Sequence, residues 1–147
     1  MPKPTVYVET SVISSLASRP SRDLIVAGHQ QLTKEWWDTR ECWHIFISPL
    51  VLQEAGGGDE VAASGRLFFA KSLPLLHFTD SVLSLAERLI YESALPEKAA
   101  EDALHVAVAA VHGMDYLLTW NRKHIANASK RCAITKSCEN AGFNPFG

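Results

Sequence analysis

The stretch 96-PEKAAEDALHVAVAAVHGMDYLLTWN-121 joins a long apolar segment directly to a short apolar run. Pro96 is typical of a first helical position, and Gly113 is typical of the residue that follows a helix. The segment between them is apolar on almost every side, which indicates a helix in the protein interior. Asp102 enters this segment about one and a half turns after the proline, roughly 8 Å from the helix start. An unpaired carboxylate is costly in such a setting, so Asp102 is expected to have a charged or hydrogen-bonded partner.

Five short runs are apolar without strict alternation, which is typical of strands buried on both faces. These expected strands are Thr5–Glu9, Ile45–Ser48, Leu75–Phe78, Tyr116–Thr119 and Cys132–Thr135. Segments with helical patterns lie between them, and this alternation favours a parallel sheet covered by helices. We therefore expect residues 1–147 to form a single domain with a three-layer α/β/α fold around a short central parallel sheet.

Helix signals appear in three further places. Two helices are expected to begin at Asp59 and at Asp80, because each aspartate is a favourable N-cap. The longest helix is expected after Pro20-Ser21. Its apolar face is expected to carry Ile25, Leu32, Trp36 and Trp43.

Composition limits the possible functions. The chain has 147 residues, 47% of them apolar, which is enough for one buried core. Its formal net charge of −2 argues against a protein coated in positive potential. Charge is nevertheless uneven, since residues 116–138 contain no Asp or Glu. That segment carries Arg122, Lys123, Lys130, Arg131 and Lys136. It is expected to attract polyanions, and an ordinary solvated surface is the competing interpretation.

Cysteine usage and the N-terminus indicate a compartment. Cys42, Cys132 and Cys138 show neither C-x-x-C pairing nor the His–Cys spacing of a zinc site, so free thiols in a reducing cytosol are expected. No charged segment precedes an apolar one at the N-terminus, and no apolar run is long enough to cross a bilayer. We expect a soluble, cytoplasmic protein.

Three acids recur at the expected turns into helices. Glu9 ends the first strand, Glu54 follows Ser48-Pro49, and Asp102 follows Leu95-Pro96 in the same manner. Turns of this kind lie along the carboxyl edge of a parallel sheet, where open α/β folds bind ligands. Each acid alone has a structural explanation, such as a favourable interaction with a helix dipole.

The joint placement of the acids favours a metal site. Each close pair of carboxylates costs on the order of 4 kcal/mol at an effective dielectric near 20. A hard divalent cation offsets this repulsion, and Mg²⁺ or Mn²⁺ suits carboxylate ligands better than zinc does. Asn121 follows the Tyr116–Thr119 strand, where it either adds an amide oxygen or caps the next helix. We therefore expect an acidic, metal-binding cleft.

These residues carry a resemblance to a known family. The opening 6-VYVETSVIS-14, the helix start 48-SPLVLQE-54, and above all 101-EDALHVA-107 followed by 116-YLLTWN-121 resemble a PIN domain. The similarity runs nearly from end to end, and the order and spacing of the acids match. PIN domains are metal-dependent nucleases, and many bacterial ones are the toxins of VapBC-type toxin–antitoxin pairs.

The resemblance implies roles for particular residues. The catalytic quartet of the family maps onto Glu9, Glu54, Asp102 and Asn121, with the three acids as metal ligands. The first position is commonly Asp and is Glu here, one methylene longer. The last is often Asp and is an amide here, which removes one negative charge. Thr10, Ser11 and Thr119 are expected to support the centre from outside the ligand shell.

The implied activity is the hydrolysis of RNA phosphodiester bonds by a Mg²⁺- or Mn²⁺-dependent endoribonuclease. A metal-bound water would attack phosphorus in line, while Arg122, Lys123, Lys130 and Arg131 hold the RNA backbone. The implied partners are a small cognate antitoxin and a second copy of the chain, and no membrane. The alternative is a catalytically weak or inactive PIN-like module that binds RNA or a protein partner. A metal-dependent phosphatase is less favoured, because no aspartyl nucleophile motif is present.

Histidine and tryptophan residues offer competing sites. His105 and His112 share a helix face with Asp102 by spacing, and on so apolar a helix we expect hydrogen-bonded core or interface histidines instead of metal ligands. Adjacent helical positions point about 100° apart, so Trp36 and Trp37 cannot both occupy one narrow core stripe. We expect one of them to lie exposed at a partner surface.

Overall fold

A parallel sheet forms the centre of the molecule. The computed structural model describes residues 2–92, 95–121, 123, 125 and 128–143, without the side chains of residues 97 and 128–130. Within these residues, β1 (Thr5–Val8) lies between β2 (His44–Phe46) and β3 (Tyr116–Leu118) in a three-stranded sheet of order β2-β1-β3. Both pairings are parallel, with Val6 opposite Ile45 on one side and opposite Tyr116 on the other.

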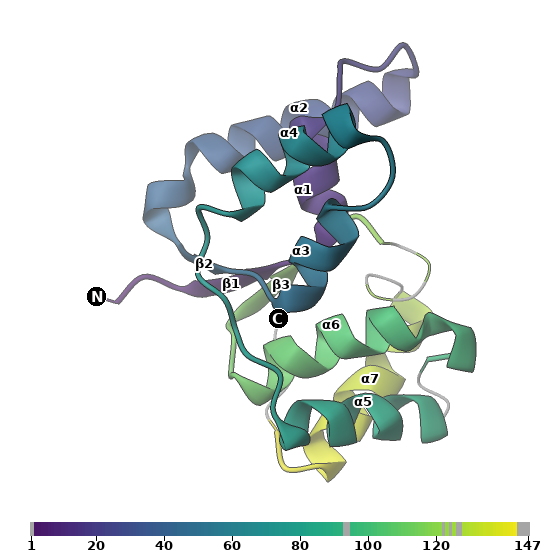
Figure 1. Ribbon diagram of the computed structural model, residues 1–147. Helices are drawn as coiled ribbons and strands as arrows, with labels where there is room; N and C mark the ends of the chain where they lie inside the picture. Colours follow the sequence, from purple (N-terminus) through teal and green to yellow (C-terminus); the bar gives the residue numbers. More distant parts are fainter. Residues whose placement is uncertain (1, 93–94, 122, 124, 126–127, 144–147) are drawn as a thin grey trace.

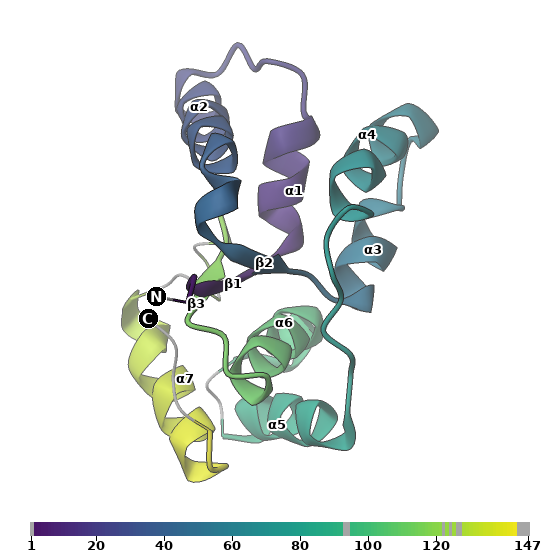
Figure 2. The ribbon, with the colours of Figure 1, turned by 90° about the vertical axis from the view of Figure 1, so that its left-hand side faces the viewer.

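Helices cover both faces of this sheet (Figure 1). One layer contains α1 (Thr10–Ala17), α2 (Leu24–Asp38), α3 (Pro49–Ala55) and α4 (Glu60–Ala70). The opposite layer contains α5 (Asp80–Tyr91), α6 (Ala100–Val111) and α7 (Ala128–Asn140), as the rotated view in Figure 2 shows. Short 3₁₀ helices occupy Arg40–Cys42 and Glu97–Ala99. This arrangement confirms the predicted three-layer α/β/α fold with a short parallel sheet.

Two of the expected strands are different in the structure. Residues 75–78 contribute only a single parallel bridge, Leu75 to Ile47, so the expected Leu75–Phe78 strand is wrong. Cys132–Thr135 lies inside helix α7, so that strand prediction is wrong as well. The buried residues of α7 are Ile134, Ser137 and Cys138, which recur at helical spacing. A run of four residues is too short to reveal that period.

The long helix α2 also differs from its prediction. Asp23 caps it by accepting hydrogen bonds from the backbone N–H groups of Ile25 and Val26. The face expected to be apolar and buried is in fact open, with Ile25 69% and Leu32 56% exposed. Trp43 lies beyond the helix. Thr33 is the buried residue of α2, because α2 packs on α1 through another side of the helix.

Helix α6 forms the buried element predicted by the sequence, with a later start. The 3₁₀ turn Glu97–Ala99 separates Pro96 from the first α-helical residue, Ala100. Asp102 therefore lies in the first turn of α6, not one and a half turns inside. Most residues of α6 between Ala103 and Ala110 are buried. Gly113 follows the helix with a φ of +67°, as expected for a glycine that ends a helix.

Smaller predictions have mixed outcomes. Asp59 caps α4 as expected, whereas Thr79 and not Asp80 caps α5. The three cysteines are free, with Cys42 and Cys132 exposed and Cys138 buried. Among the described residues, no helix has the length and apolar character needed to cross a membrane.

Candidate metal centre

Glu9 lies at the point where the central strand meets the first helix. Its backbone is extended and occupies the N-cap position of α1, and its amide donates to the Leu118 carbonyl at 3.1 Å. The side chain is only 6% exposed. Its Oε1 atom accepts hydrogen bonds from Ser11 Oγ at 2.5 Å and Thr119 Oγ1 at 2.6 Å. The sheet edge therefore fixes both the backbone and one oxygen of this carboxylate.

Glu54 reaches the same place from helix α3. Pro49 occupies the first turn of that helix and favours its start, as the sequence predicts. The Glu54 side chain is 24% exposed. Its Oε1 atom accepts a hydrogen bond from Thr10 Oγ1 at 2.5 Å and lies 2.7 Å from His105 Nε2, within hydrogen-bond distance. Helices α1 and α6 thus supply the partners of this second carboxylate.

His105 connects the carboxylate to the protein interior. Its side chain is 1% exposed, and its Nδ1 atom lies 2.6 Å from the hydroxyl of Tyr7 on β1. That hydroxyl lies 2.9 Å from Ser48 Oγ. The expectation of a hydrogen-bonded core histidine at this position agrees with these contacts. The Nε2–H group of His112 donates to the His77 carbonyl oxygen at 2.8 Å.

The geometry of these side chains fits one divalent ion. One possible ligand atom from each of Glu9, Glu54 and His105 lies within 4.8 Å of the other two. Opposite ligands of a Mg²⁺ ion are about 4.2 Å apart, given bonds of about 2.1 Å. A small inward movement of Glu9 and Glu54 is therefore enough for both carboxylates to reach one ion, and carboxylate oxygens suit Mg²⁺ or Mn²⁺.

Electrostatics around Glu54 favour a charged carboxylate. Burial acts to raise its pKa, but hydrogen bonds from His105, Glu101 and Thr10 outweigh burial and lower the pKa from 4.5 to about 2. The hydrogen bond and charge of Glu54 raise the pKa of Glu101. Glu101 is therefore protonated more readily than an isolated glutamate, and Glu54 remains the ionised member of the pair.

Asp102 and Asn121 form a pair beside this cluster. Asn121 Nδ2 donates to Asp102 Oδ1 at 2.9 Å, and the Asn121 backbone amide donates to Thr119 Oγ1 at 2.8 Å. Thr119 therefore connects this pair to Glu9. Asp102 does not belong to the group of described residues with possible ligand atoms within 4.8 Å of one another, which consists of Glu9, Glu54 and His105.

The remaining expected site residues are exposed or lie outside the described part of the chain. Arg122 and the side chain of Lys130 are not among the described residues. Lys123 and Arg131 are exposed, and Arg131 belongs to α7, which packs against α5.

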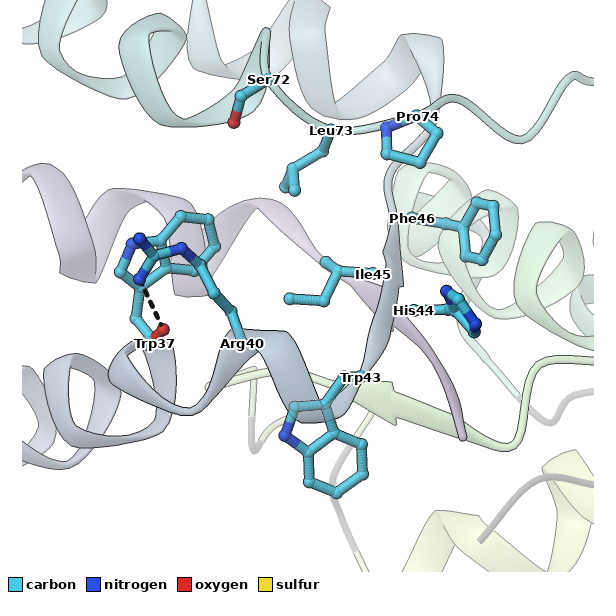
Figure 3. A pocket seen from close by; sticks show the side chains of 9 residues that line it. All are labelled: Trp37, Arg40, Trp43, His44, Ile45, Phe46, Ser72, Leu73 and Pro74. Carbon is cyan, nitrogen blue, oxygen red and sulfur yellow. Dashed lines mark hydrogen bonds between the residues drawn. The ribbon is translucent and has the colours of Figure 1, made fainter. Parts of the chain in front are cut away.

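Trp36 and Trp37 are both half-buried and pack against the core. The expectation that one of them meets a partner surface stays a prediction. Trp37 packs edge-on against Phe69, with ring centroids 5.7 Å apart. It also lines a pocket of about 340 Å³ at the outer edge of β2, together with Arg40 and Trp43 (Figure 3). None of the residues lining that pocket belongs to the carboxylate cluster.

Sequence reasoning did not assign Tyr7, Ser48, Glu101 or His105 to the site. The sequence spacing contained a signal for two of them, His105 and Tyr7. His105 lies four residues after Glu101 and three after Asp102, so it shares their helix face. Tyr7 precedes Glu9 by two residues and therefore points to the same side of the strand.

The layer order, the sheet and the position of the acids together define a PIN-type fold. No protein-family model and no curated protein matches the sequence. Among solved structures, the chain is similar to Mycobacterium tuberculosis VapC20, described as a sarcin–ricin loop cleaving toxin. The TM-score is 0.58 at 17% sequence identity, covering 84% of this chain and 95% of VapC20. This similarity shows that the chain has the fold of a VapC-type toxin.

Proposed function

We propose that this chain is a Mg²⁺- or Mn²⁺-dependent endoribonuclease and the toxin of a type II toxin–antitoxin pair. The main support is the convergence of Glu9 and Glu54 at the carboxyl edge of the sheet in a PIN-type fold. Two carboxylates this close are costly without a cation, and the edge of a parallel sheet is where open α/β folds bind ligands. The similar toxin VapC20 is described as cleaving the sarcin–ricin loop, which supports a cleavage reaction for this chain as well.

The proposed ligands are Glu9, Glu54 and Asp102, acting directly or through water. A divalent ion held there would offset the carboxylate charge and polarise a phosphodiester group of the RNA. Glu9 and Glu54 each keep one oxygen fixed by two donors, which holds the carboxylates in place before the ion arrives. Asn121 orients Asp102 through its amide.

The proposed substrate contacts come from the basic segment after β3. Arg122, Lys123, Lys130 and Arg131 would neutralise backbone phosphates, which makes RNA binding strongly dependent on salt. We expect the logarithm of RNA affinity to fall linearly with the logarithm of salt concentration, with a slope that decreases when Lys123 is replaced by Ala.

The proposed partners are a second copy of the chain and a small antitoxin in the same cytoplasm. Support comes from large apolar side chains left open on α2 and α4, which include Leu24 at 89% and Phe68 at 77% exposure. Exposed apolar groups of this kind mark protein interaction surfaces. An antitoxin arginine inserted between the carboxylates would pair with Glu9 or Asp102 and compete with the metal.

Purified chain incubated with single-stranded RNA tests the proposed activity. Cleavage is expected with Mg²⁺ or Mn²⁺, to stop with EDTA, and to be abolished by Asp102→Asn in a protein that keeps its circular dichroism spectrum. A DNA oligonucleotide of the same sequence is the substrate control. Full activity of Asp102→Asn, or RNA cleavage that persists in EDTA, contradicts the proposal.

A further inference from the structure

A chain of buried polar side chains runs from Ser48 through Tyr7 and His105 to Glu54. Ser48 and Tyr7 are fully buried and His105 is 1% exposed. The successive contacts are 2.9 Å, 2.6 Å and 2.7 Å. Burying three polar groups is costly unless every one is hydrogen-bonded. Among the described residues, all buried side-chain nitrogens and oxygens have a partner, so this chain is fully satisfied.

The end of the chain at Glu54 fixes where one proton lies. A carboxylate that binds a cation is ionised, and an ionised carboxylate only accepts hydrogen bonds. Glu54 Oε1 accepts from Thr10 Oγ1 at 2.5 Å, and His105 Nε2 lies 2.7 Å from the same oxygen. The proton between Glu54 Oε1 and His105 Nε2 therefore belongs to the imidazole. At the other nitrogen, the Tyr7 hydroxyl lies within hydrogen-bond distance of both His105 Nδ1 and Ser48 Oγ, which connects the imidazole to the rest of the chain.

The same contact argues against His105 as a ligand of the ion. Imidazole binds metals through a nitrogen that carries no proton. Nε2 is the nitrogen nearest Glu54, and it is already engaged at 2.7 Å as a donor. Thr10 donates to that same Oε1 atom, so His105 and Thr10 together fix one oxygen of Glu54. The imidazole acts on the carboxylate and not on the cation.

We propose that His105 is a positioning residue, which presents its Nε2–H to Glu54, is held in orientation by Tyr7 and Ser48, and does not coordinate the metal. This inference rests on the proposed metal-dependent function. Partners that orient a metal ligand in this way typically contribute 10- to 100-fold to metal affinity or activity. Among the described residues, the side-chain donors to the neighbouring carboxylate Glu9 are two hydroxyl groups, those of Ser11 and Thr119.

The state of the imidazole is measured directly by NMR on ¹⁵N-histidine-labelled protein. The His105 signals are assigned by their loss in His105→Gln. We expect Nε2 to carry a proton both without metal and with saturating Mg²⁺. With Mn²⁺, pulsed EPR is expected to show no coupling to a histidine nitrogen. An unprotonated Nε2 in the Mg²⁺ form, or a directly coupled nitrogen in the Mn²⁺ form, overturns the proposal.

Variants measure the contribution of the chain to metal binding. Tyr7→Phe keeps the ring and removes the hydroxyl, and is expected to weaken Mn²⁺ binding about 10-fold or more. Ser48→Ala removes only the far end of the chain and is expected to have a smaller effect. His105→Gln retains an amide donor, so it is expected to bind Mn²⁺ more tightly than His105→Leu.

Binding and RNA cleavage separate this inference from the proposed function. Mn²⁺ affinity is measured by titration without RNA, and circular dichroism checks the fold of each variant. Wild-type affinity in both Tyr7→Phe and His105→Leu contradicts a positioning role. If His105→Leu does not fold, Tyr7→Phe and the NMR experiment still decide. A chain that binds Mn²⁺ as expected but cleaves no RNA contradicts the proposed function alone.

Discussion

Glu9 and Glu54 meet in one place but are held by different kinds of structure. Glu9 continues the central strand, and its backbone amide is hydrogen-bonded to Leu118 of the neighbouring strand. Glu54 stands on the seven-residue helix α3 and is held by side chains from two other helices. Backbone pairing within a sheet is shared by many residues, whereas a side-chain contact is lost with a single substitution. The Glu54 side of the centre is therefore expected to be more sensitive to changes in its supporting residues.

The largest expected effect comes from Glu54→Gln. The amide keeps the shape of the side chain and its oxygen still accepts from Thr10 and His105, so the fold is retained while the charged ligand is lost. We expect RNA cleavage to fall by more than about 100-fold. This exceeds the roughly 10- to 100-fold loss that is typical when a residue that only orients a metal ligand is removed. Glu60→Gln on the exposed surface of α4 is the control, with unchanged cleavage. Equal rates for the two variants would remove Glu54 from the centre.

A shorter acid tests how firmly the backbone fixes Glu9. Glu9→Asp restores the residue more common in PIN domains but withdraws the carboxylate by about 1.5 Å, one carbon–carbon bond. Ligand distances tolerate only about 0.2 Å, and the contacts with Ser11 and Thr119 are lost as well. We expect cleavage to fall about 10- to 100-fold at fixed Mn²⁺ concentration. Activity equal to that of the wild type would show that the sheet edge adapts to either acid.

A matched pair of substitutions compares the two sides directly. Thr10→Val removes one donor from Glu54, and Ser11→Ala removes one donor from Glu9. Because the backbone of Glu9 is paired within the sheet, we expect Thr10→Val to weaken Mn²⁺ binding about 10-fold and Ser11→Ala to weaken it less. Titration of each variant with Mn²⁺ gives the ratio. A stronger effect from Ser11→Ala would reverse the comparison.

The smallest expected effect is on stability in acid. The pKa of Glu54 in the folded protein is about 2, below its ordinary value of 4.5, so ionised Glu54 stabilises the fold above pH 4.5. That contribution is lost as pH falls from 4.5 towards 2. The raised pKa of Glu101 acts in the opposite direction above pH 4.5, outside this window.

Urea unfolding in metal-free buffer measures this dependence. We expect the free energy of unfolding of the wild type to decrease more between pH 4.5 and 2 than that of Glu54→Gln. Parallel curves for the two proteins would show that Glu54 is not held in its charged form by His105 and Thr10.

The sequence predicts those parts of the fold that local patterns determine. The apolar runs at β1, β2 and β3, the proline at the start of α3 and the apolar character of α6 were each sufficient to place an element. The segment 132–135 was not, because the buried residues of α7, Ile134, Ser137 and Cys138, repeat at a helical period that needs a longer window. The open face of α2 was also missed, since an apolar stripe predicts burial without specifying whether the covering surface belongs to the same chain.

The candidate site was predictable only in part for a related reason. Acids that follow strands or begin helices were recognisable from their positions along the chain. The contacts of His105 with Tyr7 and Glu54 join residues 98 and 51 positions apart, and no local pattern encodes such distances. The pairing of Asn121 with Asp102 likewise depends on how β3 meets α6.

Mn²⁺ binding to the wild type, Glu9→Gln and Glu54→Gln, followed by EPR of the free ion, tests the central claim most directly. If both carboxylates hold one ion, each single variant is expected to weaken binding by more than about 100-fold, because each removes a charged ligand from the same site. Wild-type affinity in either variant would contradict a shared metal centre at the carboxyl edge of this sheet.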